Sequence, residues 1–268
     1  MVELKVEERE RADEALLDGL QRAAFDYFLA AVNPANGLIA DTSREHSPSS
    51  IAVVGFALSA YPVAVERGWM ARSDAVERSL CVLRFFRDSD QSGSPQATGY
   101  KGFYYHFLDM HTGARVWRSE LSMIDTALLI AGALAAGMYF TANTREETEL
   151  RELVEALYLR VDWRWSQGGA TTIRQGWKPE CGFLHYGWDG YNEAIILYSQ
   201  VATHQPSAPW AYLQIAYSKE EAGQQEPAIQ AFQTVCKKFP KDAHAGIAHA
   251  HLQQKYKISV TLGGAAEE

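Results

Sequence analysis

The stretch SELSMIDTALLIAGALAAGMYF, residues 119–140, sets two carboxylates, Glu120 and Asp125, directly before an apolar run. The uninterrupted apolar run from Ala127 to Phe140 is 14 residues long, which is short of the ~20 needed to cross a bilayer. A helix that is apolar on every side has to be buried all round. The stretch therefore predicts a buried core helix in an all-α protein.

Two other segments, 51–66 and 191–202, are equally apolar and predict buried helices of the same kind. The three segments begin near Ser50, Glu120 and Tyr191, so their starts lie 70 and 71 residues apart. This spacing indicates a repeat of architecture in which each unit has an outer amphipathic helix, a long loop and an inner apolar helix.

Outer amphipathic helices are predicted over residues 12–32, 73–87 and 144–164. The third opens with Thr144 followed by Glu147, the spacing of a capping box. In a series of such hairpins, all the long loops lie at the N-terminal ends of the inner helices. The loops therefore share one face, and loops of this length are usually functional.

The long loops are crowded with aromatic residues, a composition that suits sugar binding because a sugar ring stacks on an aromatic face. Some of these rings can instead pack beneath the loop. The first loop carries Tyr100, Phe103, Tyr104, Tyr105, Phe107 and Trp117, and the second carries Trp177, Trp188 and Tyr191.

Three carboxylates accompany these rings, and each has a structural alternative. Glu120 can simply stabilise a helix N-terminus, whereas Asp125, one turn into a buried helix, requires a partner or a use. Glu193 follows Asn192 and can cap its helix, or burial among aromatic rings can raise its pKa toward that of a general acid. Cys181, His185 and His106 match no metal-ligand template, so no metal site and no cofactor is predicted.

The segments that carry these features, residues 47–69, 99–134 and 176–198, resemble the glycoamylase-like family. That family includes bacterial endo-β-1,2-glucanases and a domain of cyclic β-1,2-glucan synthases. The resemblance implies an (α/α)6 toroid and acid-assisted cleavage of β-glucan. It implies Glu193 as general acid, Asp125 and Glu120 lining the subsites and Asp41 facing the same cleft. From the aromatic loops we predict as further substrate-binding residues Tyr100, Tyr104, Trp117, Trp177, Trp188, Tyr191 and Asn192.

The chain departs from that family after residue 205. A complete toroid has six hairpins, whereas three are predicted here, and residues 207–242 instead resemble one tetratricopeptide repeat. We therefore predict a glycoamylase-like half-toroid over 1–205, tetratricopeptide-like helices over 206–258 and a disordered tail over 259–268. An open half-toroid would expose apolar sides of its inner helices, which favours a homo-oligomer.

Charge, cysteine content and the N-terminal sequence indicate which partners and which compartment to expect. The net charge of −8 argues against nucleic-acid binding, which depends on basic patches. Three widely spaced cysteines predict unpaired thiols, and the charged N-terminus shows no signal peptide, which favours a cytoplasmic protein.

The leading hypothesis is a glycoside hydrolase that acts on or binds β-glucan. Two alternatives remain: a catalytically inactive carbohydrate-binding remnant, and a protein-interaction module built on the tetratricopeptide-like segment.

Overall fold

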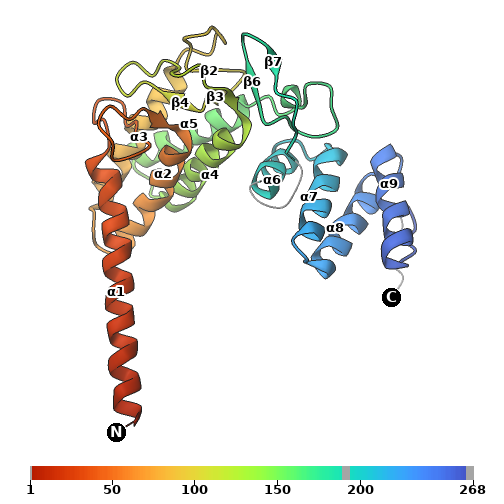
Figure 1. Cartoon of the computed structure of the whole chain (residues 1–268), viewed down its shortest axis with the longest axis horizontal. Helices are drawn as coiled ribbons and strands as arrows, with labels where there is room; N and C mark the ends of the chain where they lie inside the picture. The colour runs from red at the N-terminus through yellow and green to blue at the C-terminus, as the bar shows by residue number, and fades with distance from the viewer. Residues whose placement is uncertain (1, 189–193, 264–268) are drawn as a thin grey trace.

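The computed structural model describes residues 2–188 and 194–263. Most of this part of the chain is helical, and the fold reads as hairpins laid side by side, with α1 extending away at one end and α7 to α9 following at the other (Figure 1). The helices are α1 (Val2–Ala30), α2 (Ile51–Glu66), α3 (Arg72–Asp88), α4 (Met123–Tyr139), α5 (Arg145–Arg160), α6 (Ala194–His204), α7 (Pro209–Glu221), α8 (Gln225–Lys238) and α9 (Ala243–His251).

The two inner helices α2 and α4 are in direct backbone contact through a pair of glycines. A Cβ atom added to Gly132 would lie 1.9 Å from the carbonyl oxygen of Gly55, and one added to Gly55 would lie 2.4 Å from the carbonyl oxygen of Leu128. Real Cβ atoms do not approach backbone atoms this closely, so each position accepts only glycine at the observed separation of the helices.

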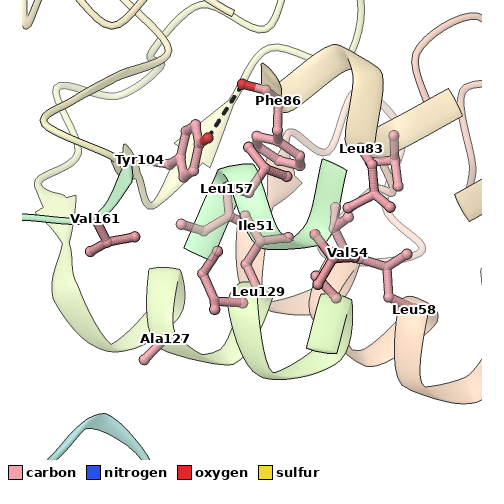
Figure 2. Packing of buried hydrophobic residues seen from close by; sticks show 14 of the residues in the cluster. Ile51, Val54, Leu58, Leu83, Phe86, Tyr104, Ala127, Leu129, Leu157 and Val161 are labelled. Carbon is pink, nitrogen blue, oxygen red and sulfur yellow. Dashed lines mark hydrogen bonds between the residues drawn. The ribbon is translucent and has the colours of Figure 1, made fainter. Parts of the chain in front are cut away.

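Apolar side chains of four helices fill the space around this contact. Figure 2 shows Ile51, Val54 and Leu58 of α2 in one cluster with Leu83 and Phe86 of α3, Leu129 of α4 and Leu157 of α5. All seven are buried. The outer helices α3 and α5 thus cover one side of the inner pair.

The other side of the inner helices is open, so the prediction that they are buried all round is wrong for that side. Phe56 and Val63 on α2 are each 50% exposed, Met138 on α4 is 81% exposed and Ile196 on α6 is 37% exposed. The prediction that an open half-toroid exposes apolar residues of its inner helices is confirmed.

The long loops contain short strands, which the prediction of an all-α fold did not include. Backbone pairing of the first loop with the second gives a five-stranded antiparallel sheet in the order β2-β3-β5-β6-β7, and β1 pairs with β4 separately. The strands are β1 (Ser49–Ser50), β2 (Gly99–Tyr100), β3 (Phe103–Tyr105), β4 (Phe107–Leu108), β5 (Leu121–Ser122), β6 (Gly176–Lys178) and β7 (Gly182–Phe183).

Several helix boundaries follow the sequence, but α1 begins at Val2, ten residues before its predicted start, and α5 ends at Arg160, four residues before its predicted end. Helix α2 has the predicted bounds, but α4 begins only at Met123 because the two preceding residues form β5. At α5, the Glu147 backbone N–H donates to Thr144 Oγ1 as predicted, at 3.2 Å. The Glu147 carboxylate does not complete the capping box: it accepts two hydrogen bonds from Arg72, at 2.7 and 2.9 Å.

The C-terminal helices have a core of their own. The predicted repeat forms the hairpin α7–α8, and a cluster around Phe232 and Cys236 is separate from the main core that runs from Phe25 to Ala211. Helix α9 continues into one π-helical turn, Leu252–Tyr256. The three cysteines are unpaired, as predicted. Within the described residues, every helix is too short or too polar to span a membrane.

The glycine contact can be tested with two alanine substitutions in the same helix. We expect Gly132→Ala to lower the free energy of unfolding by about 1–3 kcal/mol, because the added methyl group must push α2 and α4 apart. Gly137→Ala is the control: its Cβ would make ordinary contacts at 3.4 Å with Val154, and alanine favours a helix by up to about 1 kcal/mol over glycine. Urea denaturation measures both, and equal stability of the two variants would contradict the close packing.

Candidate active site

Two strands bring a histidine and a carboxylate together at the N-terminal end of α4. Strands β3 and β5 pair Tyr105 with Leu121, so the next residues outward, His106 and Glu120, also face each other. The His106 backbone N–H donates to the Glu120 carbonyl oxygen at 2.9 Å, and His106 Nδ1 lies 3.0 Å from Glu120 Oε1.

Asp125 joins this pair from the first turn of α4. Ser122 caps the helix: its Oγ accepts a hydrogen bond from the Asp125 backbone N–H at 3.2 Å and donates to Asp125 Oδ2 at 2.5 Å. The same carboxylate oxygen lies 3.6 Å from His106 Nε2, an ion-pair distance. The prediction that Asp125 requires a partner or a use is confirmed. Glu120 and Asp125 both contact His106, because Glu120 precedes strand β5 and is not part of helix α4.

The surroundings of His106 favour its charged form. Burial lowers the pKa of His106, but the hydrogen bond with Glu120 and the charges of Asp125, Glu120 and Asp41 outweigh burial and raise that pKa above its ordinary value. The hydrogen bond with His106, helped by the charges of His106 and Lys178, lowers the pKa of Glu120. Glu120 is therefore an ionised acceptor, a state unsuited to donating a proton.

His106, Glu120 and Asp125 also form the one group of potential metal-ligand side chains in the described part of the chain, with ligand atoms within 4.8 Å of one another. A ring nitrogen binds a metal ion through a free lone pair. Both nitrogens of His106 face carboxylate oxygens, the arrangement of a doubly protonated ring, so the geometry favours an ion-paired cluster over a metal centre.

Aromatic residues of the two loops surround the sheet in two groups. Tyr100 and Trp177 stack on each other with ring centroids 5.4 Å apart, and Trp165 packs edge-on against both. Trp117 is 71% exposed and lies 5.2 Å from the ring of Phe107, which stacks on His106 at 3.9 Å. Trp188 is partly buried, and its backbone carbonyl accepts the hydroxyl of Tyr198 at 2.6 Å.

Tyr104 requires a correction. Its side chain is only 1% exposed, packs edge-on against Phe86 and donates its hydroxyl proton to the Phe86 carbonyl oxygen at 3.3 Å (Figure 2). A ring enclosed in this way has no face to offer a sugar, so the prediction that Tyr104 binds substrate does not hold. The neighbouring Phe103 and Tyr105 are buried as well.

A buried arginine ties the two loops together. Arg115, whose side chain is 1% exposed, donates two hydrogen bonds to the Glu180 carboxylate at 2.8 and 3.1 Å and packs over the ring of Tyr105. It also donates to the backbone carbonyls of Arg118 and Ser119. This network fixes the second loop, through Glu180, against the end of the first.

The remaining predicted residues divide into two sets. Asp41 is partly buried near His106, whose pKa its charge raises, and its backbone N–H donates to the Pro48 carbonyl oxygen at 2.8 Å. Tyr191, Asn192 and Glu193 lie outside the described residues. Their predicted roles stay predictions.

Comparison with known proteins gives the site a context. Over 199 residues the chain is 27% identical to an exo-β-1,2-glucooligosaccharide sophorohydrolase of Parabacteroides distasonis, a match that covers 69% of this chain and 26% of that protein. The solved β-1,2-glucanase of the same organism superposes with a TM-score of 0.67 at 25% identity, over 84% of this chain and 33% of that one. The resemblance to glycoamylase-like proteins is confirmed.

A further solved structure supports the fold alone. The endo-β-1,2-glucanase of Chitinophaga pinensis, solved with sophorotriose and glucose, superposes with a TM-score of 0.64 at 17% identity, over 85% of this chain and 68% of that one. Residues 210–242 match the tetratricopeptide repeat model, as predicted. The chain thus spans about a quarter of the curated relative that it matches in sequence.

Sequence reasoning considered His106 only as a metal ligand, and it missed Ser122 and the pair of Arg115 and Glu180. His106 stands in the aromatic run 103–107, where no periodicity singles it out. The available signal was the pairing of that run with the residues before α4, which places position 106 opposite position 120.

The charge cluster predicts a pH-dependent contribution to stability. Because folding raises the pKa of His106, this residue stabilises the fold fully below the ordinary histidine pKa, and the stabilisation is lost as the pH rises through the pKa of the folded state. Because folding lowers the pKa of Glu120, this residue stabilises the fold fully above the ordinary glutamate pKa, and the stabilisation is lost as the pH falls through the pKa of the folded state. We expect His106→Gln to cost about 1 kcal/mol between the ordinary glutamate and histidine pKa values, and less on either side. Melting temperatures of both proteins, taken from well below this range to well above it, measure the cost. A difference that stays constant beyond both ends of the range would contradict the ion pair.

The buried arginine can be compared with an exposed one of the same geometry. Arg84 makes a bidentate pair with Glu149 at 2.7 Å, but its side chain is 46% exposed. We expect Arg115→Lys to lower the free energy of unfolding by about 2–3 kcal/mol, because a lysine cannot replace the forked contacts of a buried guanidinium. Arg84→Lys should cost under about 1 kcal/mol. Similar losses of unfolding free energy for both variants in chemical denaturation would show that the buried Arg115–Glu180 pair stabilises the fold no more than a surface pair does.

Proposed function

We propose that this chain supplies the acid and sugar-binding side of a glycoside hydrolase that acts on β-1,2-linked glucan. The observation that carries the proposal is the convergence of His106, Glu120 and Asp125 on the face that bears the aromatic loops. The substrate class in this proposal, β-1,2-linked glucan, comes from the similar proteins, whose names give activity on β-1,2-linked glucose.

The roles follow from charge. Hydrolysis of a glycosidic bond begins when a carboxylic acid protonates the leaving oxygen, and the acid needs a raised pKa. Glu120 is unsuited to this role because its pKa is lowered, so the acid in our proposal is Glu193 of the GYNE motif. Glu120 would accept hydrogen bonds from sugar hydroxyls, and Asp125 would orient the sugar or an attacking water.

Binding without cleavage is the second candidate. A glycosidase uses two carboxyl groups on opposite sides of the scissile bond, about 5–9.5 Å apart. Glu120 and Asp125 both contact the same imidazole and so lie on one side. If no carboxylate stands opposite them, the aromatic loops would hold a glucan that is not cleaved.

A protein partner is favoured by a separate observation. Residues 210–242 match a tetratricopeptide repeat, a fold whose helices often form binding surfaces. Its apolar face packs within this chain, against α6 and α9, so a partner would bind the outer surface of α7–α9, where Ile247 is 48% exposed.

Reducing-end release from linear β-1,2-glucan tests the enzyme. We expect cleavage by the native chain and a loss of about 10²–10⁴-fold in Glu193→Gln, because the amide cannot donate the proton. Glu226→Gln, a change of the same kind on α8, is the control and should leave the rate unchanged. Full activity of Glu193→Gln would remove the assigned acid. A native chain that binds the glucan in calorimetry without releasing reducing ends would support the binding candidate.

A further inference from the structure

A cavity lies at the end of a row of rings that begins at the charge cluster. The ring of Phe107 stands between His106 and Trp117, stacked on the first at 3.9 Å and 5.2 Å from the second. Trp117 lines a cavity of about 540 Å³. Binding pockets for small molecules usually enclose ~300–1,000 Å³, so the space suits a ligand the size of one or two sugar units.

The walls of this cavity combine the two kinds of surface that a sugar requires. Trp117, Pro48 and Met110 provide apolar surface, and Arg44, Asp109 and His111 provide charged and polar groups. A pyranose ring stacks its C–H face on an indole while its hydroxyls bond to polar groups at the edge. The lining therefore matches a neutral sugar ring better than a purely apolar ligand.

The backbone presents Trp117 outward at a conformational cost. Trp117 and the next residue, Arg118, both adopt left-handed conformations, with φ of 56° and 52°, a region that disfavours residues other than glycine. Hydrogen bonds from Arg115 to the carbonyl oxygens of Arg118 and Ser119 hold this turn. Because the Trp117 indole is 71% exposed, its packing offsets little of this backbone strain. Strain of this kind is often kept for binding, which indicates a role for Trp117 outside the core.

Asp41 also relates the cavity to the charge cluster. The backbone N–H of Asp41 donates to the carbonyl oxygen of Pro48, a cavity residue, and the charge of Asp41 acts on His106. Asp41 and the Phe107 ring thus both connect the cavity to the charge cluster.

We propose that this cavity is a remote subsite for the glucan. In it, Trp117 stacks on one glucose unit of an oligosaccharide whose scissile linkage lies at the His106 cluster. The inference rests on the proposed function for its substrate class. It adds that the protein favours longer oligosaccharides and that Trp117 carries the preference without taking part in cleavage.

Calorimetric titration with linear β-1,2-linked oligomers of glucose, from the disaccharide to the hexasaccharide, tests the subsite on the full chain. We expect the affinity of the native protein to rise with length, and Trp117→Ala to lower the affinity for the longest oligomers about tenfold while leaving that for the disaccharide unchanged. Trp117→Phe keeps an aromatic face and should restore most of the gain. Unchanged melting temperatures would show that the variants fold, as the exposed indole leads us to expect.

The possible results separate the two proposals. An equal loss of affinity at every oligomer length would place Trp117 in the cleavage site and overturn the remote subsite. An affinity that Trp117→Ala leaves unchanged at every length would also overturn it. Length-dependent binding without release of reducing ends would support the subsite and remove the hydrolase. A native protein that binds none of the oligomers would overturn the subsite together with the substrate class.

Discussion

The contact between Gly55 and Gly132 is the constraint on which the rest of the structure depends. Two apolar helices approach until backbone meets backbone, because neither carries a side chain at the crossing. That approach lets α3 and α5 close over the pair at the centre of the main core, which runs from Phe25 to Ala211. It also fixes the N-terminal ends of α2 and α4 relative to each other, and the loops that precede those ends pair as strands. The position of His106, Glu120 and Asp125 is thus a consequence of helix packing.

The sequence predicts the helices well because their signals are local. Apolar runs, caps and turn residues lie within a few positions of the boundary that they determine, and α2 has the predicted bounds. The site is predicted less well because its signals are distant. Glu120 and Asp125 lie five positions apart and would diverge on a helix, yet they meet at His106 because the first of them precedes a strand that pairs with residues 104 and 105. Strands two or three residues long leave almost no periodic pattern from which to predict that pairing.

The aromatic residues show the same limit within a single loop. Tyr104 and Trp117 are both large rings in the run between α3 and α4, and composition alone assigns both to a sugar surface. Strand β3 is covered on both faces, by Phe86 on Tyr104 and by Trp163 on Phe103, so its rings belong to the core. Trp117 stands in a strained turn held by Arg115 and points to solvent. Which rings are available to a ligand depends on tertiary contacts that a count of aromatic residues does not contain.

The exposed side of the inner helices relates the core to the candidate site. On α4, Asp125, Leu128, Ala131, Ala135 and Met138 recur every three or four residues and are all at least partly exposed, so they share one stripe. The carboxylate stands at the start of that stripe and apolar side chains continue it. An element that covered the apolar part would therefore border Asp125. Because Asp125 also contacts His106, an element on the apolar part of the stripe would change the surroundings of the cluster of His106, Glu120 and Asp125. Packing on the open side and the environment of the candidate site are therefore linked through α4.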